Sequence, residues 1–369
     1  MSAPVSRDLD LLYTDVEDSL RDSVRAMLTS RCSPEAVLPV YEGEREHAAA
    51  LWRALAQDLG LAGLLVPEEY GGAGASAREA AVVLEELGRF AAPVPFLTSS
   101  VVATTAALPS ADTGLLTRLA AGEQSAVLTV PFNLGTFLPQ VQLQDGSLQG
   151  RVTSVAGAVD ADVLLVPVAT GGGVELHLVR AGDPGVRVTP VVSLDMTRPV
   201  ADIDLAGAAS RCVVGADSGE EAVRHAWELG AALLASEQLG LAEWCLEATV
   251  DYLGDRKQFG RPVGGFQAIK HRLADLWVEV ESARAAARHA AATAAAGHPD
   301  FPVAASLAQA YCSDVAVHAA EECVQLHGGI GMTWEHPAHL YLKRAKADQI
   351  GFGTAGMHRS RLAELVDLG

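Results

Sequence analysis

The chain has 369 residues, of which 49% are apolar, and a formal net charge of −19 at pH 7. This length suits two or three domains with sizeable cores, and the apolar content excludes a disordered chain. The acidic charge excludes nucleic acid or an anionic membrane as an expected partner, and no apolar run is long enough for membrane insertion. Because the N-terminus lacks a signal-peptide core, we expect a cytoplasmic protein.

The N-terminal third of the sequence predicts helices. Apolar residues recur at helical spacing over 8–30, and further helices are expected over 46–59, 77–89 and 95–121. We therefore predict a helical N-terminal domain over 1–122.

Short β-branched runs follow, separated by Gly and Asp turns. They cover 125–130, 141–144, 163–168, 174–179 and 186–192. This spacing predicts a small antiparallel β-domain, placed at 123–217.

Long helical patterns return after residue 218. They cover 266–280, 283–297 and 303–327, and the pair Gly328 and Gly329 ends the last of them. The expected fold is therefore α+β and mostly α, with a helical C-terminal domain over 218–369.

The cysteines show neither metal-binding nor disulfide spacing, so each is expected to be a small buried side chain. They are Cys32, Cys212, Cys245, Cys312 and Cys323. No metal site is predicted.

One segment between two predicted helices carries groups suited to a nucleotide cofactor. Its residues are Arg256, Gln258, Phe259, Gly260, Phe266 and Gln267. Arg can bind a pyrophosphate with two hydrogen bonds, Gln can hydrogen-bond an adenine edge, and Phe can stack on an aromatic ring. Gly lets the backbone approach closely. Taken alone, the same segment could be a surface loop with an ion pair.

A second segment, 325–337, contains Gln325 followed by Gly328 and Gly329. Taken alone, the glycines are a helix end and a turn. A glycine pair at a helix end can also let a phosphate or ribose approach backbone N–H groups.

Together these two segments resemble the flavin-adenine contact regions of the acyl-CoA dehydrogenase family of flavoproteins. Segments 65–74, 83–89, 119–131 and 336–344 resemble the same family, so the resemblance covers most of the chain. It implies a helical domain, a β-domain and a C-terminal four-helix bundle, assembled as a dimer of dimers. It also implies FAD contacts across a subunit interface from Arg256, Gln258, Phe259, Phe266, Gln267, Gln325, Gly328 and Gly329, with Thr129 as a further candidate near the flavin ring.

The resemblance implies an acyl-CoA substrate and an acceptor of the electron-transfer flavoprotein type. The reaction is α,β-desaturation in lipid metabolism, as in β-oxidation. Bacterial relatives of this kind often act on bulky acyl-CoAs such as sterol side chains.

The chain departs from the family pattern at the catalytic positions. The family loop T-E-P-x-x-G-S-D, which holds flavin and thioester, is here Thr129-Val-Pro-Phe-Asn-Leu-Gly-Thr136. The usual base position falls on Phe352, and the alternative position used by some members falls on Gly230. Neither residue can accept the α-proton while the β-hydride leaves for the flavin.

Three interpretations remain open. The chain could be the FAD-contacting, base-lacking subunit of an α₂β₂ heterotetramer with a homologous chain. It could instead be a self-sufficient, homotetrameric dehydrogenase with a displaced base, Glu237 or Glu228. A third interpretation is a non-catalytic scaffold subunit that has lost FAD.

Overall fold

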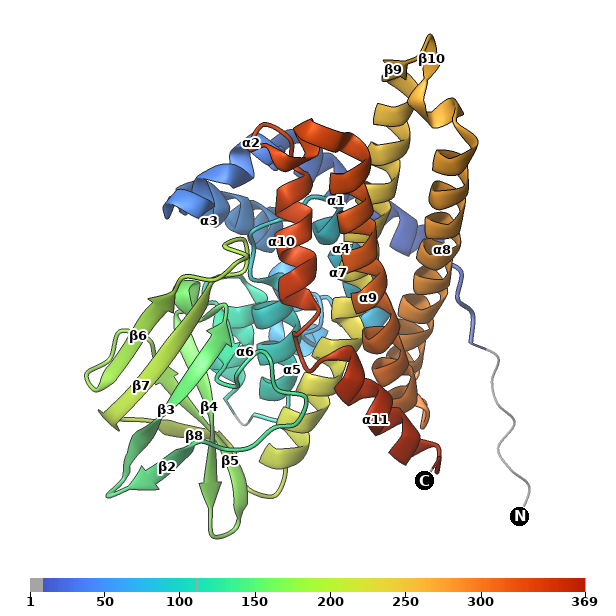
Figure 1. Cartoon of the computed structure of the whole chain (residues 1–369). Helices are drawn as coiled ribbons and strands as arrows, with labels where there is room; N and C mark the ends of the chain where they lie inside the picture. The colour runs from blue at the N-terminus through green and yellow to red at the C-terminus, as the bar shows by residue number, and fades with distance from the viewer. Residues whose placement is uncertain (1–8, 111, 369) are drawn as a thin grey trace, which may run out of the picture.

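The computed structural model describes residues 9–110 and 112–368. Asp8, the first residue of the helix predicted over 8–30, lies outside this part. Helices, a sheet and a second set of helices follow one another along the chain (Figure 1).

The N-terminal part contains helices of three kinds. The α-helices are α1 (Asp15–Arg31), α2 (Pro34–Val37), α3 (Glu46–Arg53), α4 (Ala77–Arg89), α5 (Thr104–Ala107) and α6 (Thr113–Ala120). Short 3₁₀ and π turns join them: η1 (Leu38–Glu42), η2 (Ala54–Asp58), η3 (Leu61–Gly63), η4 (Glu68–Tyr70) and η5 (Phe96–Ala103).

Side-chain caps explain where these helices begin. Thr14 and Glu17 form a capping box, so α1 starts at Asp15, later than predicted. Ser76 and Glu79 form the same box at α4, whose predicted bounds 77–89 are confirmed. The helical pattern predicted over 95–121 is confirmed, and it consists of three elements, η5, α5 and α6.

The strands form one sheet in the order β6-β7-β3-β2-β4-β5-β8, with β1 beside β4. They are β1 (Ala126–Leu128), β2 (Val141–Gln144), β3 (Ser147–Ala156), β4 (Val163–Thr170), β5 (Gly173–Arg180), β6 (Val186–Val191), β7 (Val200–Ala208) and β8 (Arg211–Val214), with η6 (Ala158–Asp160) between β3 and β4. Most pairings are antiparallel, but β1 and β2 both run parallel to β4. The five predicted strands are confirmed, while β3, β7 and β8 were missed.

The C-terminal part is a bundle of long helices. These are α7 (Gly219–Asp255), α8 (Gln267–Ala295), α9 (Phe301–His327), α10 (Ala338–Asp348) and α11 (Ala355–Leu365). The hairpin of β9 (Lys257–Gln258) and β10 (Arg261–Pro262), with η7 (Val263–Gly265), joins α7 to α8 and projects beyond one end of the bundle (Figure 1). A last turn, η8 (Gly328–Met332), follows α9.

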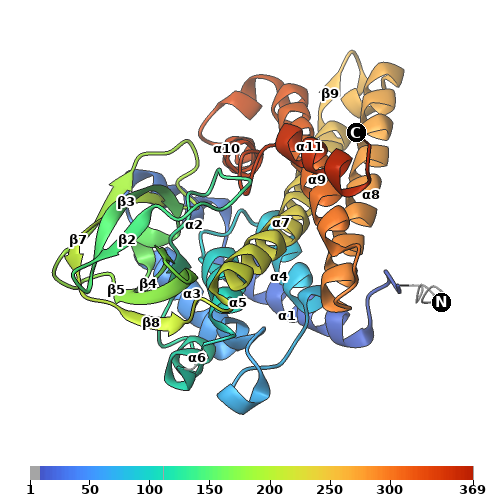
Figure 2. The same cartoon turned by 90° about the horizontal axis from the view of Figure 1, so that it is seen from below.

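Helix α7 lies between the sheet side of the molecule and the outer helices α8 and α9 (Figure 2). It crosses α4 at very short range, because a Cβ on Gly240 would lie 1.9 Å from the Glu85 carbonyl oxygen. Gly88 makes the matching approach, because a Cβ on Gly88 would lie 2.1 Å from the Glu237 carbonyl oxygen. These glycines bring the N-terminal and C-terminal helices into one core. Among the described helices, none is both long and apolar enough to cross a membrane.

Candidate functional site

The two sequence positions that align with family bases meet in space. Gly230 lies within α7, and Phe352 lies in the loop between α10 and α11. A Cβ on Gly230 would lie 2.6 Å from Cε1 and 2.7 Å from Cζ of Phe352. Both positions therefore face one point in the core, and a phenyl ring occupies it.

Phe352 is the centre of an aromatic plug, which also contains Phe132 and Trp227. The Phe352 ring lies 4.4 Å from the Trp227 ring and 5.3 Å from the Phe132 ring, both in edge-to-face geometry. The Phe352 N–H donates to the Phe132 carbonyl at 2.7 Å, and the Trp227 indole donates to the Leu134 carbonyl at 2.8 Å. The plug is thus held by backbone hydrogen bonds as well as by packing.

Phe352 adopts a left-handed backbone conformation, with φ of 56°, and its side chain is buried. This conformation costs a non-glycine residue about 1–2 kcal/mol. The hydrogen bond to Phe132, and a second from His358 Nε2 to the Phe352 carbonyl at 3.1 Å, hold the loop in place. The small cavity between Thr98, Val102 and the plug has a volume of about 10 Å³, which is the space of a single water at most. A thioester does not fit there.

Glu237, one of the two alternative bases, belongs to a buried ion cluster of Asp195, Arg198, Glu237, Arg344 and Asp348. Its two carboxylate oxygens lie 2.6 Å from Arg344 Nε and 2.6 Å from Arg198 Nη2. Burial alone would raise the pKa of Glu237, but the two guanidinium groups lower it below its ordinary value. A buried carboxylate with a lowered pKa and two arginine partners is a poor proton acceptor.

Glu228, the other alternative, lies between two arginines at the wall of a cavity of about 440 Å³. Its carboxylate is 3.3 Å from Arg224 Nη1 and also pairs with Arg361. The same cavity is lined by Thr136 and by Trp227 of the plug. Glu228 therefore does not belong to the plug, and its carboxylate is paired with Arg224 and Arg361.

The residues predicted to contact FAD near the first segment lie on and beside the β9–β10 hairpin. Arg256, Gln258 and Phe259 are exposed, and the Phe259 side chain is 92% exposed. Phe266 packs edge-to-face on Phe259 at 6.3 Å. Gln267 begins α8 and is also exposed.

The second predicted segment lies at the same end of the bundle. The Tyr252 ring in the last turns of α7 stacks at 4.5 Å on His327, the last residue of α9. Gln325, Gly328 and Gly329 are exposed, and a Cβ on either glycine would meet nothing within 4 Å. The backbone is therefore open to a ligand from outside the chain.

Thr129 is placed differently from the other eight candidates. It is buried, and its hydroxyl donates to the Leu165 carbonyl at 2.6 Å. The Thr129 hydroxyl therefore already donates its hydrogen bond to strand β4 in this structure.

Sequence reasoning missed the role of Trp227 and of the Arg224–Glu228–Arg361 group. Trp227 lies three residues before Gly230, which places both on one face of a helix. That spacing is a signal that could have pointed to an aromatic neighbour of the base position.

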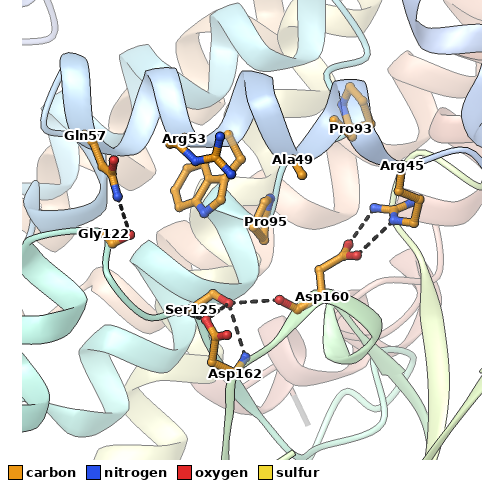
Figure 3. A pocket seen from close by; sticks show the side chains of 12 residues that line it. Arg45, Ala49, Arg53, Gln57, Pro93, Pro95, Gly122, Ser125, Asp160 and Asp162 are labelled. Atoms are coloured by element: carbon orange, nitrogen blue, oxygen red, sulfur yellow. Dashed lines mark hydrogen bonds and ion pairs between the residues drawn. The ribbon is translucent and has the colours of Figure 1, made fainter.

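A separate cavity of about 280 Å³ lies between α3 and the β-domain (Figure 3). Its acidic side chains are already engaged, because Asp160 pairs with Arg45 and Asp162 accepts from Ser125. The FAD candidates, Glu228 and Glu237 do not line it.

Comparisons with known proteins agree with this architecture. The family model described as acyl-CoA dehydrogenase, N-terminal domain, matches residues 14–122, and that described as acyl-CoA dehydrogenase, C-terminal domain, matches residues 217–366. The chain is 37% identical over 332 residues to acyl-CoA dehydrogenase IpdE2 of Mycolicibacterium smegmatis, covering 90% of this chain and 93% of that protein.

Two solved structures of paired proteins are similar over nearly the whole chain. The ChsE4–ChsE5 complex from Mycobacterium tuberculosis matches with a TM-score of 0.87 and 29% identity, over 97% of this chain and 99% of that chain. The Tcur3481–Tcur3483 steroid ACAD matches with a TM-score of 0.85 and 28% identity, over 96% and 98%.

Proposed function

The chain belongs to the acyl-CoA dehydrogenase family, whose members bind FAD, and we propose that it is the base-lacking, FAD-contacting subunit of a heteromeric complex. A homologous partner chain supplies the catalytic carboxylate and the acyl-CoA pocket. The proposal rests on the contrast between an open cofactor-contact surface and a filled catalytic position within one chain.

The observation that carries the proposal is the contact between Gly230 and Phe352. Removal of the α-proton requires a positioned base, which contributes about 10²–10⁴-fold to such a reaction. Neither residue at the two positions expected for that base can accept a proton, and the Phe352 ring occupies the point that both positions face.

The exposed residues at the end of the bundle fit the adenine-diphosphate part of FAD. Arg256 would hold the pyrophosphate, Gln258 and Gln325 would hydrogen-bond it or the adenosine, and Phe259 would pack on a ring. Gly328 and Gly329 leave open backbone for close approach. When bound, FAD supplies the acceptor for the hydride; the residues of this chain bind and orient it. Thr129 and the plug do not suit the flavin ring, so the ring is assigned to the partner's site.

Exposed apolar side chains support a protein partner at this surface. Phe259, Met332 and Trp334 at the hairpin end are 92%, 82% and 62% exposed, and Trp277 on the outer face of α8 is 56% exposed. Large apolar side chains that are exposed to this degree indicate an interaction surface. We assign it to a homologous acyl-CoA dehydrogenase chain, because two similar solved structures are complexes of two differently named proteins.

The name of one similar structure suggests a substrate class. Since the Tcur3481–Tcur3483 protein is called a steroid ACAD, we propose that the complex acts on a bulky, steroid-derived acyl-CoA. Its electrons would pass to an acceptor of the electron-transfer flavoprotein type.

The test is co-expression with a homologous chain that carries Glu at the position of Phe352 or Gly230. We expect the two chains to purify together as a yellow complex that reduces ferrocenium when acyl-CoA is added. Changing the partner's Glu to Gln should abolish turnover and leave the flavin absorbance unchanged. Failure of the chains to associate, or full turnover after the partner's Glu is changed, would reject the proposal.

A further inference from the structure

Three side chains that can ligate a metal converge at the edge of the sheet, outside the plug and the FAD candidates described above. Glu175 and His177 lie on β5, and Cys212 lies on the edge strand β8. One ligand atom from each residue lies within 4.8 Å of the other two. We call this group the Glu-His-Cys triad.

Strand pairing explains the convergence. His177 and Cys212 are direct partners across the β5–β8 ladder, and strands β5 and β8 lie side by side in Figure 1. Glu175 precedes His177 by two residues, so it points to the same face of the sheet. The backbone therefore fixes all three side chains on one face without a long loop.

The histidine is oriented from both sides. His177 is buried, its Nδ1 lies 2.9 Å from the Ser210 hydroxyl, and its Nε2 lies 2.9 Å from a Glu175 carboxylate oxygen. A hydroxyl can donate or accept, so Ser210 can support either tautomer of the ring. Metal-ligating histidines are usually held in this way, with a polar partner on the second ring nitrogen.

Charge also favours a cation at this point. Burial and the neighbouring Glu175 carboxylate raise the pKa of the Cys212 thiol. A divalent cation between the two groups would reverse that repulsion and favour the thiolate. Cys212 is exposed and Glu175 half-buried, so an ion can enter from solvent.

We propose that the Glu-His-Cys triad binds one divalent transition-metal ion, with Zn²⁺ as the best match, and thereby clamps the edge strand β8 to β5. Imidazole, carboxylate and thiolate together suit Zn²⁺, and a solvent molecule completes a tetrahedral site. Hard cations such as Mg²⁺ prefer all-oxygen sites and are disfavoured.

Proton balance follows from the coordination. The metal replaces the thiol proton of Cys212, which is released to solvent. With the metal on Nε2, the neutral His177 ring carries its proton on Nδ1, which donates to Ser210, and Glu175 contributes a carboxylate oxygen. One proton is released per metal bound, so binding should weaken as the pH falls.

The experiment is a titration of the tag-free, metal-free chain with Co²⁺, followed by displacement with Zn²⁺. We expect one ion per chain, a thiolate-to-cobalt charge-transfer band, and a rise in Tm on addition of Zn²⁺. Absence of one-to-one binding, or binding without the thiolate band, would overturn the proposal. This readout is independent of acyl-CoA turnover, so it is separate from the proposed function.

Variants locate the site. Cys212→Ser should remove the charge-transfer band, and His177→Gln should abolish binding. Ser210→Ala should weaken binding about 10- to 100-fold, as changes to outer hydrogen-bond partners of metal ligands do. Glu220→Gln, on the exposed start of α7, is the matched control and should bind normally. Unchanged affinity and spectrum in both Cys212→Ser and His177→Gln would also reject the site, and Cys212 is exposed enough for its variant to fold.

Discussion

Gly230 and Phe352 are in such close contact that a methyl group on Gly230 would lie 2.6 Å from Cε1 of the Phe352 ring. A carboxylate side chain at position 230 would therefore collide with the Phe352 ring.

This contact can be measured as an interaction energy. Gly230→Ala should lower the free energy of unfolding by about 1–3 kcal/mol, because it overpacks the site. Phe352→Leu in the same chain should recover only part of that loss, because Val102 Cγ2 would still lie 2.8 Å from the new methyl group. Urea unfolding of the two single variants and the double variant tests this. Strictly additive costs would contradict direct contact.

Arg256 should govern cofactor binding by the complex. Arg256→Ala removes hydrogen bonds to a charged pyrophosphate, so FAD should bind about 10- to 100-fold more weakly. The measurement is FAD affinity of the complex by fluorescence titration. Arg53→Ala changes an exposed arginine on α3; this variant is the control and should leave FAD affinity unchanged. Equal FAD affinities for the two variants would show that Arg256 does not contact FAD.

Substitution of the two alternative bases, Glu237 and Glu228, should have different effects on stability and on turnover. Glu237→Gln removes one partner from a buried ion cluster, so it should destabilise the chain by about 3–5 kcal/mol. Glu228→Gln should leave ferrocenium-linked turnover of the complex unchanged at temperatures where the variant is folded. A loss of turnover in a folded Glu228→Gln complex would instead support a displaced base.

Asp348 should make stability depend on pH. Burial among the other carboxylates of the ion cluster raises the pKa of Asp348 to about 8, against about 3.9 in an unfolded chain. Between these values the folded protein holds a proton that the unfolded chain has lost. The contribution of this group to the free energy of unfolding is therefore present below about pH 4 and is lost as the pH rises to about 8.

Asp348→Asn is neutral at every pH, so its stability should fall less between about pH 6 and pH 9 than that of the parent chain. Denaturant titrations across this range measure the difference. Glu243, whose pKa burial raises to about 7, titrates in both proteins and cancels in the comparison. Parallel curves for the two proteins would contradict the assignment.

Capping residues and β-branched runs in the sequence predicted the helices and strands whose bounds depend on neighbouring residues. Ser76 and Glu79 mark the start of α4, and β-branched runs mark five strands. Strands β3 and β7 were missed because polar residues such as Arg151 and Asp202 interrupt their apolar pattern on the exposed face.

The residues expected at the two base positions could be identified from the sequence alone, but the plug could not. Phe132, Trp227 and Phe352 come from three separate parts of the chain, and only tertiary packing brings their rings together. The roles of Glu237 and Glu228 depend likewise on arginines distant in sequence, among them Arg344 and Arg361.

Turnover by this chain alone tests the central claim most directly. The chain would be purified without any homologue, supplied with FAD, and assayed for acyl-CoA-dependent reduction of ferrocenium. Because both base positions are filled by Gly230 and Phe352, we expect a rate no higher than that of the reaction without protein. Robust acyl-CoA oxidation by the purified homo-oligomer would contradict the account.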